Sequence, residues 1–192
     1  MAHNTLHIKN MVCDRCIMVV ENVLKELEIP YSNITLGVAM LEKEISETDK
    51  TKLADKLESL GFELLQSRKN ILAEKIKNLI IQHVQYASNP IPVNISTYLV
   101  ENMHMDYSQL SNTFSETENM TIEQYTLLQK TEKVKELLSY GEMTLTQIAD
   151  KMGYTSVAYL SAQFKKQTGI SPTQYKNSKT LSRKALDKIK TH

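Results

Sequence analysis

The sequence predicts an α+β protein in which a small βαββαβ domain, residues 1–66, precedes an all-α domain, residues 71–178. Three observations support this prediction. The 192 residues suffice for two small domains. Five glycines and four prolines are few turn residues, which favours a helix-rich fold over a sandwich or a barrel. Strand-like and helix-like hydrophobic patterns alternate in the first third, whereas the remainder is helical and internally repeated.

The first third has the pattern of six short elements. Residues 6–8 alternate like a strand, and residues 16–27 carry apolar side chains at helical spacing. Two short strands interrupted by Gly37 are expected within residues 34–45, then a helix over residues 48–60 and a strand over residues 62–65. This order is that of the ferredoxin-like motif.

The all-α region contains an internal repeat with an offset of 50 residues. Tyr107–Tyr125 and Val157–Tyr175 are identical at five of nineteen positions, including a Leu and a Phe one helical turn apart. Each copy follows a short amphipathic helix and ends at Asn119 or Gly169, residue types that tolerate the left-handed conformation. The pattern predicts two helix-turn-helix units, about 93–118 and 144–168, joined by a helix over about 122–139. A plain αα-hairpin has the same apolar pattern and is the alternative.

The charge distribution is uneven. Residues 151–192 contain nine Lys or Arg and one acid, a net charge of +8, whereas residues 1–150 have a net charge of −7. A basic end, including a basic C-terminal tail over residues 179–192, indicates a polyanionic partner. A solvated, lysine-rich terminus is the other interpretation.

Residues 71–176 resemble the DNA-binding domain of AraC/XylS-type regulators. The resemblance rests on the signature Ile148-Ala149-(x3)-Gly153-Tyr154-(x5)-Leu160-(x3)-Phe164-Lys165-Lys166-(x2)-Gly169-(x2)-Pro172-(x2)-Tyr175. It implies two helix-turn-helix units on one long helix, and a sequence-specific transcription regulator that binds double-stranded DNA as a monomer or homodimer.

The resemblance also implies which residues contact DNA. The base-facing positions are Ser108, Gln109, Ser111 and Asn112 in the first unit and Val157, Ala158, Ser161 and Ala162 in the second. Gln and Asn can bind adenine through two hydrogen bonds, whereas small apolar side chains contact thymine methyl groups. The side chains suited to phosphates are Thr155, Ser156, Lys165 and Lys166. The first unit departs from the family, because Ser115 and Glu116 occupy the positions of the two lysines.

The only two cysteines, Cys13 and Cys16, lie where a strand gives way to a helix. A helix start lowers the pKa of a thiol, and two thiolates suit a soft ion such as Cu(I), or Zn(II) with added ligands. Met11-(x)-Cys13-(x2)-Cys16 and Leu60-Gly61-Phe62 resemble heavy-metal-associated domains, although Asn10 stands where those favour Gly. A redox dithiol, or an inert remnant in a dimerisation domain, are the alternatives.

Together these features favour a cytoplasmic DNA-binding regulator that responds to a soft metal ion but requires none to bind DNA. A metal-carrying protein and RNA polymerase are candidate partners. The alternative is a metal-transfer or metal-binding protein whose helical C-terminal half is a protein-interaction module. We expect no enzymatic activity, because the sequence has no nucleophile triad order, phosphate-binding Gly loop or His-Glu-x-x-His. No apolar run is long enough to span a membrane.

Overall fold

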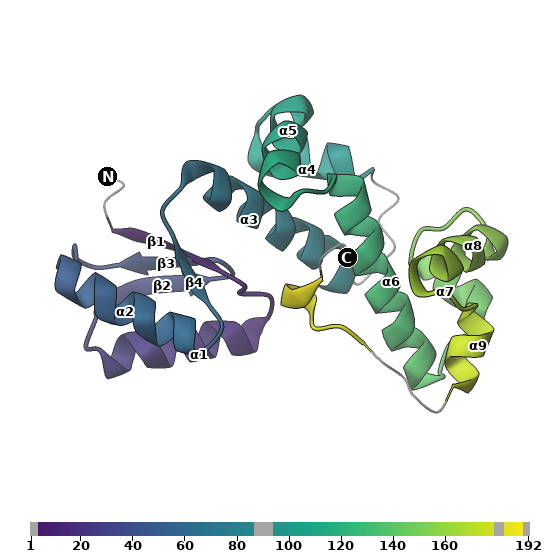
Figure 1. The fold of residues 1–192 in the computed structure, drawn as a ribbon, viewed down its shortest axis with the longest axis horizontal. Helices are drawn as coiled ribbons and strands as arrows, with labels where there is room; N and C mark the ends of the chain where they lie inside the picture. The colour runs from purple at the N-terminus through teal and green to yellow at the C-terminus, as the bar shows by residue number, and fades with distance from the viewer. Residues whose placement is uncertain (1–3, 87–93, 179–182, 190–192) are drawn as a thin grey trace. The chain divides into compact units, whose positions relative to one another are not determined.

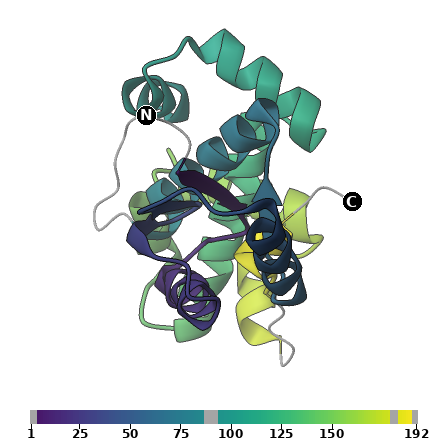
Figure 2. The same ribbon diagram turned by 90° about the vertical axis from the view of Figure 1, so that its left-hand side faces the viewer.

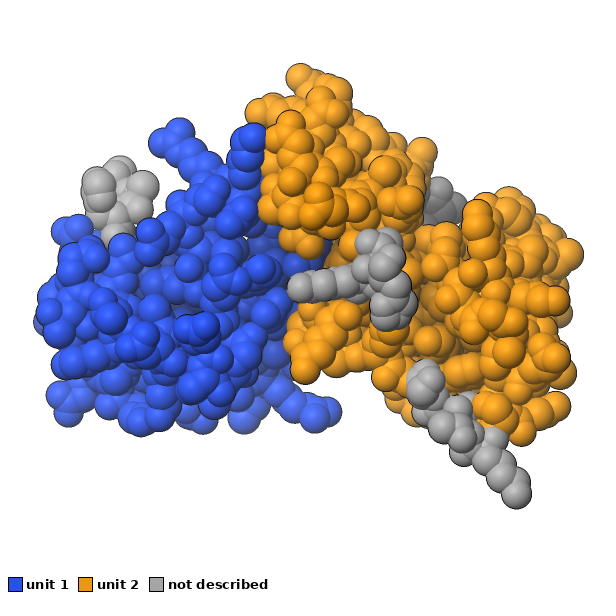
Figure 3. Space-filling model, viewed as in Figure 1, with its two compact units in different colours: residues 1–78 blue, residues 79–192 orange. Residues whose placement is uncertain are grey.

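The computed structural model describes residues 4–86, 94–178 and 183–189. The chain divides into two compact units, Met1–Asn78 and Leu79–His192 (Figure 3). The division falls inside one helix, α3 (Arg68–Ile81), rather than in the short segment before it, where the sequence patterns placed the domain boundary. None of the described helices combines the length and the apolar character needed to cross a membrane.

The first unit has the predicted βαββαβ order, with element bounds close to those expected (Figure 1). Its four strands form one antiparallel sheet in the order β2-β3-β1-β4. The elements are β1 (Thr5–Lys9), α1 (Asp14–Glu26), β2 (Tyr31–Thr35), β3 (Val38–Leu41), α2 (Glu47–Ser59) and β4 (Glu63–Leu65).

Strand alternation gives this sheet two different faces. One face packs against α1 and α2, which lie on the same side of the sheet (Figures 1 and 2). The core between them includes Ile8, Ala39, Leu24, Leu53 and Leu57, all shielded from solvent. The alternate residues Thr5, His7, Val38 and Met40 point to the opposite face, because successive side chains of a strand point in opposite directions.

The second unit is all-α. A π-helical turn, η1 (Gln82–Tyr86), continues α3. The helices that follow are α4 (Ile95–Met103), α5 (Tyr107–Glu118), α6 (Ile122–Tyr140), α7 (Leu145–Lys151), α8 (Val157–Thr168), α9 (Pro172–Asn177) and the 3-10 turn η2 (Leu186–Lys188). The pairs α4–α5 and α7–α8 coincide with the predicted helix-turn-helix units, although residue 93 lies outside the described residues. Helix α6 is one residue longer than the predicted linker helix.

The internal repeat reappears as repeated geometry. Phe114 packs against Tyr125 with ring centroids 5.7 Å apart, and Phe164 packs against Tyr175 at 5.6 Å. All four rings are buried. Helices α5 and α8 are therefore each anchored through the same kind of aromatic pair to the helix that follows.

The helix ends repeat as well. Asn119 and Gly169 end α5 and α8 in the left-handed conformation, with φ of 55° and 82°. The next helices begin with matched capping boxes, Thr121 with Gln124 and Ser171 with Gln174. The same short turn therefore separates α5 from α6 and α8 from α9.

Part of the predicted basic tail is packed against α6 rather than extended into solvent. Arg183 forms an ion pair with Glu136 at 2.6 Å, and the backbone N–H of Lys184 donates to the buried carboxylate of Glu132. Ile189 is also buried. Residues 179–182 and 190–192 of this tail lie outside the described residues.

Candidate nucleic-acid interface

Helix α8 has one buried and one exposed face. Leu160 and Phe164 are buried, whereas Ala158 and Ala162 are exposed, and Val157 and Ser161 are half-buried. The predicted base-facing side chains therefore lie away from the core, as an α-helix in a major groove requires. Their assignment to base contacts stays a prediction.

Cations and hydroxyls flank this exposed face. Lys165 and Lys166 lie in the last turn of α8, are exposed, and pair with no carboxylate among the residues that the structure describes. At the other end, the Ser156 hydroxyl caps the helix by accepting the N–H of Tyr159 at 3.1 Å, and Thr155 is exposed beside it. The hydrogen of the Ser156 hydroxyl stays available to a phosphate, because the cap uses only the oxygen lone pairs.

Tyr159 is an outward residue of α8 that the predicted base-facing set does not include. Its side chain is 51% exposed on α8, and its ring meets that of Tyr154 edge-on at 6.0 Å. The repeat contained the signal, because Tyr159 lies 50 residues after Gln109, which was assigned to base contact. A large aromatic at this position can pack on a sugar or a thymine methyl group.

Helix α5 presents a more polar surface. Leu110 and Phe114 are buried; Ser108, Gln109 and Asn112 are exposed, and Ser111 is half-buried. The amide side chains that can discriminate adenine therefore point away from the core. Glu116, exposed one turn beyond Asn112, adds negative charge where α8 carries Lys166.

Helix α5 is connected to α6 by a side-chain hydrogen bond. The Tyr107 hydroxyl at the start of α5 donates to the Glu123 carboxylate in the first turn of α6. Burial and this hydrogen bond raise the pKa of Tyr107 well above its usual range, and the same hydrogen bond lowers the pKa of Glu123. The neutral phenol and the charged carboxylate are thus the favoured forms.

The second unit is tied to α6 by a lysine. Lys130 Nζ donates to the carbonyl of Met152, the C-cap of α7, at 3.0 Å and lies 5.3 Å from the centroid of the Tyr154 ring. Burial lowers the pKa of Lys130 and raises that of Tyr154 to about 12. The turn between α7 and α8 is therefore held by the linker helix.

A buried polar network fixes the middle of α6. The side chain of Gln129 is fully buried; it donates to the Tyr125 hydroxyl at 2.9 Å and to the carbonyl of Leu186 at 3.3 Å. Gln85 donates to both the backbone and side-chain carbonyls of Gln129, each at 3.1 Å. Because these hydrogen bonds join Gln129 of α6 to Gln85 and to Leu186, the network fixes η1 and the C-terminal segment on the helix that connects the two helix-turn-helix units.

The two cysteines lie close together in the α/β unit, residues 1–78. Cys13 is the N-cap of α1, Cys16 lies in its first turn, and their sulfurs are 3.6 Å apart. Both are partly exposed. The expected lowering of thiol pKa by the helix start is wrong for Cys16, because burial raises its pKa. Among the described residues no group of three or more His, Cys, Asp or Glu side chains is arranged to hold a metal.

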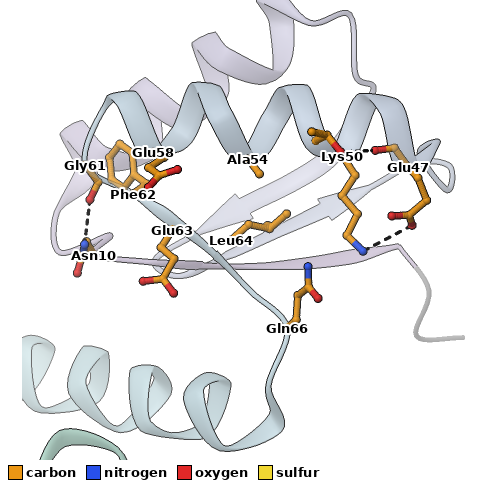
Figure 4. A pocket seen from close by; sticks show the side chains of 11 residues that line it. Asn10, Glu47, Lys50, Ala54, Glu58, Gly61, Phe62, Glu63, Leu64 and Gln66 are labelled. Carbon is orange, nitrogen blue, oxygen red and sulfur yellow. Dashed lines mark hydrogen bonds and ion pairs between the residues drawn. The ribbon is translucent and has the colours of Figure 1, made fainter.

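Asn10 shapes the loop before the cysteines. Its φ is 71°, which explains why a residue tolerant of the left-handed region stands where Gly was expected. Its side-chain amide donates to the Gly61 carbonyl at 2.9 Å (Figure 4), and its backbone N–H donates to Glu74 at 2.8 Å. Glu74 is buried and also accepts from Lys77 at 2.9 Å. The cysteine loop is therefore fastened to α3.

Comparison with known proteins agrees with this geometry. Residues 99–178 match the family model described as a helix-turn-helix domain. No curated protein matches the chain.

Solved structures resemble the helical part. The C-terminal domain of AraT, a response regulator from Geobacillus stearothermophilus, is 24% identical with a TM-score of 0.52, over 60% of this chain and 92% of that one. The C-terminal domain of the two-component response regulator yesN from Fusobacterium nucleatum is 29% identical with a TM-score of 0.47, over 54% of this chain and 96% of that one. The likeness to the AraT domain shows the fold of the part of this chain that it covers.

Proposed function

We propose that this protein is a transcription regulator of the AraC/XylS type that binds double-stranded DNA sequence-specifically. One observation carries the proposal: two helix-turn-helix units repeat on a single linker helix, and the outward face of each second helix is unused by the core. The match of residues 99–178 to a helix-turn-helix domain supports it. Such a regulator acts in the cytoplasm, where its DNA lies, and RNA polymerase is its candidate partner.

In this proposal the two helix-turn-helix units make different contacts with DNA. In the first, Gln109 and Asn112 bind adenines through paired hydrogen bonds. In the second, Ala158 and Ala162 contact thymine methyl groups, while Lys165 and Lys166 neutralise phosphates. No cofactor is needed for these contacts, because side chains of the two helices supply them.

Selection from random duplex DNA tests the proposal. We expect enrichment of a site with two half-sites about one helical turn, roughly 10 base pairs, apart. The control is Lys165→Glu with Lys166→Glu, whose exposed positions leave the fold intact by circular dichroism but whose charge opposes DNA. Absence of any enriched sequence with the folded wild-type protein would refute the proposal.

We further propose that the α/β unit, residues 1–78, is a ferredoxin-like, heavy-metal-associated domain that makes the regulator responsive to a soft ion. Two partly exposed thiols 3.6 Å apart support this, because thiolates select soft ions. The donor set suits Cu(I) better than Zn(II), because a structural zinc site takes four ligands and, among the residues that the structure describes, no third His, Cys, Asp or Glu joins the two sulfurs. A metal-carrying protein would deliver the ion.

Metal titration joined to DNA binding tests this second proposal. Cys13→Ser with Cys16→Ser should abolish Cu(I) binding by the reduced protein and leave the helical content unchanged. If the ion controls DNA binding, DNA must change ion affinity by the same factor, with a coupling of about 1–3 kcal/mol. Equal DNA affinity of both proteins across Cu(I) and Zn(II) concentrations would refute metal control but leave DNA binding standing. Metal binding without any enriched DNA site would instead favour a metal-transfer protein.

A further inference from the structure

A hollow of about 770 Å³ opens at the end of the sheet where β1 begins, and it reaches from the face opposite the helices to Glu47 and Lys50 in the first turn of α2. The rest of its lining combines residues of the paired strands with the first two turns of α3. His7 lies beside its strand partner Val38, and Met40, Ile71 and Lys75 complete this part of the wall. The volume falls in the range of small-molecule sites, roughly 300–1,000 Å³.

Much of the wall is apolar. Val38 and Met40 come from β3, Leu65 from β4 and Ile71 from α3. Met40 is 46% exposed on the sheet, although a methionine is usually buried. Its flexible thioether side chain can adapt to the shape of a ligand. This surface therefore suits a short hydrocarbon group.

One end of the hollow carries the lysine Lys75 and the histidine His7. The charge of Lys75 on α3 adds to burial in lowering the pKa of His7. Neither side chain pairs with a carboxylate in the part of the chain that the structure describes. Glu44, Glu47 and Lys50 line the hollow elsewhere, and Lys50 lies 3.7 Å from Glu47. A negative group bound beside both side chains would offset the effect of Lys75 and raise the pKa of His7, whose neutral imidazole can also donate a hydrogen bond to a carboxylate.

We propose that this hollow binds a small organic anion, a carboxylate with a short hydrocarbon chain. The carboxylate lies between His7 and Lys75, and the chain lies on Val38, Met40 and Ile71. The proposal is independent of the proposed DNA binding, because every lining residue belongs to the α/β unit, residues 1–78, and none to a helix-turn-helix unit.

A second hollow of the same unit provides an internal contrast. It lies between α2 and the edge strand β4, has about 570 Å³, and is lined by Glu47, Glu58 and Glu63 with Lys50 as its only lysine (Figure 4). This excess of carboxylates repels an anion. Anion binding is therefore expected at the end of the first hollow that holds His7 and Lys75, and not at the part that it shares with the second hollow, Glu47 and Lys50.

Octanoate is a suitable probe, with octylammonium as the control of similar chain length and opposite charge. The full-length reduced protein is titrated with each compound while the His7 imidazole signal is followed by NMR, assigned with His7→Gln. We expect saturable binding of octanoate with a rise in the pKa of His7, and at least fivefold weaker binding of octylammonium.

Two matched variants locate the site. Lys75→Gln should weaken octanoate binding at least fivefold, whereas Lys52→Gln, an exposed lysine of α2 outside the hollow, should leave it unchanged. Amide spectra check that both variants fold. Absence of a saturable His7 response, equal binding of octylammonium, or equal losses in the two variants would each overturn the proposal.

Discussion

The two helix-turn-helix units share an interior and differ in their exteriors. Leu110 and Phe114 are buried in one as Leu160 and Phe164 are in the other, with matching aromatic partners and helix ends. Most outward positions have diverged, although Ser111 and Ser161 are identical: Gln109, Asn112 and Glu116 in the first unit correspond to Tyr159, Ala162 and Lys166 in the second. Packing constrains the inward residues of a repeat, whereas the outward ones are left to function.

The units also differ in how α6 holds them. The first is tied at the start of its recognition helix, through Tyr107 and Glu123. The second is tied at the turn before its recognition helix, through Lys130 and the carbonyl of Met152. The equivalent helices α5 and α8 are thus held by contacts at non-equivalent positions, so the repeat in sequence is not matched by a repeat in the contacts with α6.

The largest expected effect tests the shared interior. Phe114→Ala and Phe164→Ala should each destabilise the helical unit by about 3–5 kcal/mol, because both rings are almost fully buried and their removal leaves a cavity. Denaturant unfolding followed by circular dichroism at 222 nm measures both. A cost below about 1 kcal/mol in one variant alone would show that the two interiors are not equivalent.

The next effect tests the divergent exteriors. Asn112→Ala should cost about 1–3 kcal/mol at one base pair of the selected site and leave non-specific binding nearly intact. The matched change at the equivalent position of the second unit, Ala162→Asn, should create a new preference for adenine instead. Competition binding with single-base variants of the site measures both. An unaltered site preference for Asn112→Ala would remove this residue from base reading.

A smaller effect tests the division between reading and anchoring. Lys165→Ala with Lys166→Ala should weaken binding to all sequences and reduce the salt slope, d log K/d log[salt], by up to about two units. Ser115→Lys with Glu116→Lys places lysines at the equivalent positions of the first unit and should steepen the slope by a similar amount. Binding at 50–200 mM salt measures it. If the first double variant keeps the wild-type slope, the lysines of α8 do not contact phosphates.

The smallest effect tests the tie of the first unit. Tyr107→Phe removes the hydrogen bond to Glu123 and should cost about 0.5–1 kcal/mol, because the site is only partly buried. The folded state lowers the pKa of Glu123 from 4.5, so this stabilisation is present above that value and is lost as the pH falls through the lowered pKa. The raised pKa of Tyr107 acts oppositely, so its contribution fades as the pH rises beyond 10.

Comparison of wild type and Tyr107→Phe by denaturant unfolding should therefore show the largest difference at neutral pH and a smaller one at pH 3. Tyr140→Phe is the control, because Tyr140 is 62% exposed. A difference that does not shrink at low pH would mean that the phenol stabilises α5 by packing and not through the carboxylate.

The sequence by itself determined the local structure of this protein. Strand alternation, helical periodicity and capping residues involve neighbours along the chain, so α6 and both recognition helices ended within about a residue of their predicted positions. The offset of 50 residues also pairs Tyr159 with Gln109, so the repeat alone marks Tyr159 as an outward position of its helix.

Only the tertiary structure decided the contacts between distant segments. The hydrogen bond from Asn10 to Glu74 spans 64 residues, the one from Lys130 to Met152 spans 22, and the packing of Lys184 on Glu132 spans 52. Burial, and with it the raised pKa of the Cys16 thiol, also follows from packing. No local pattern specifies such pairs, because they depend on how completed helices and strands are placed around a common core.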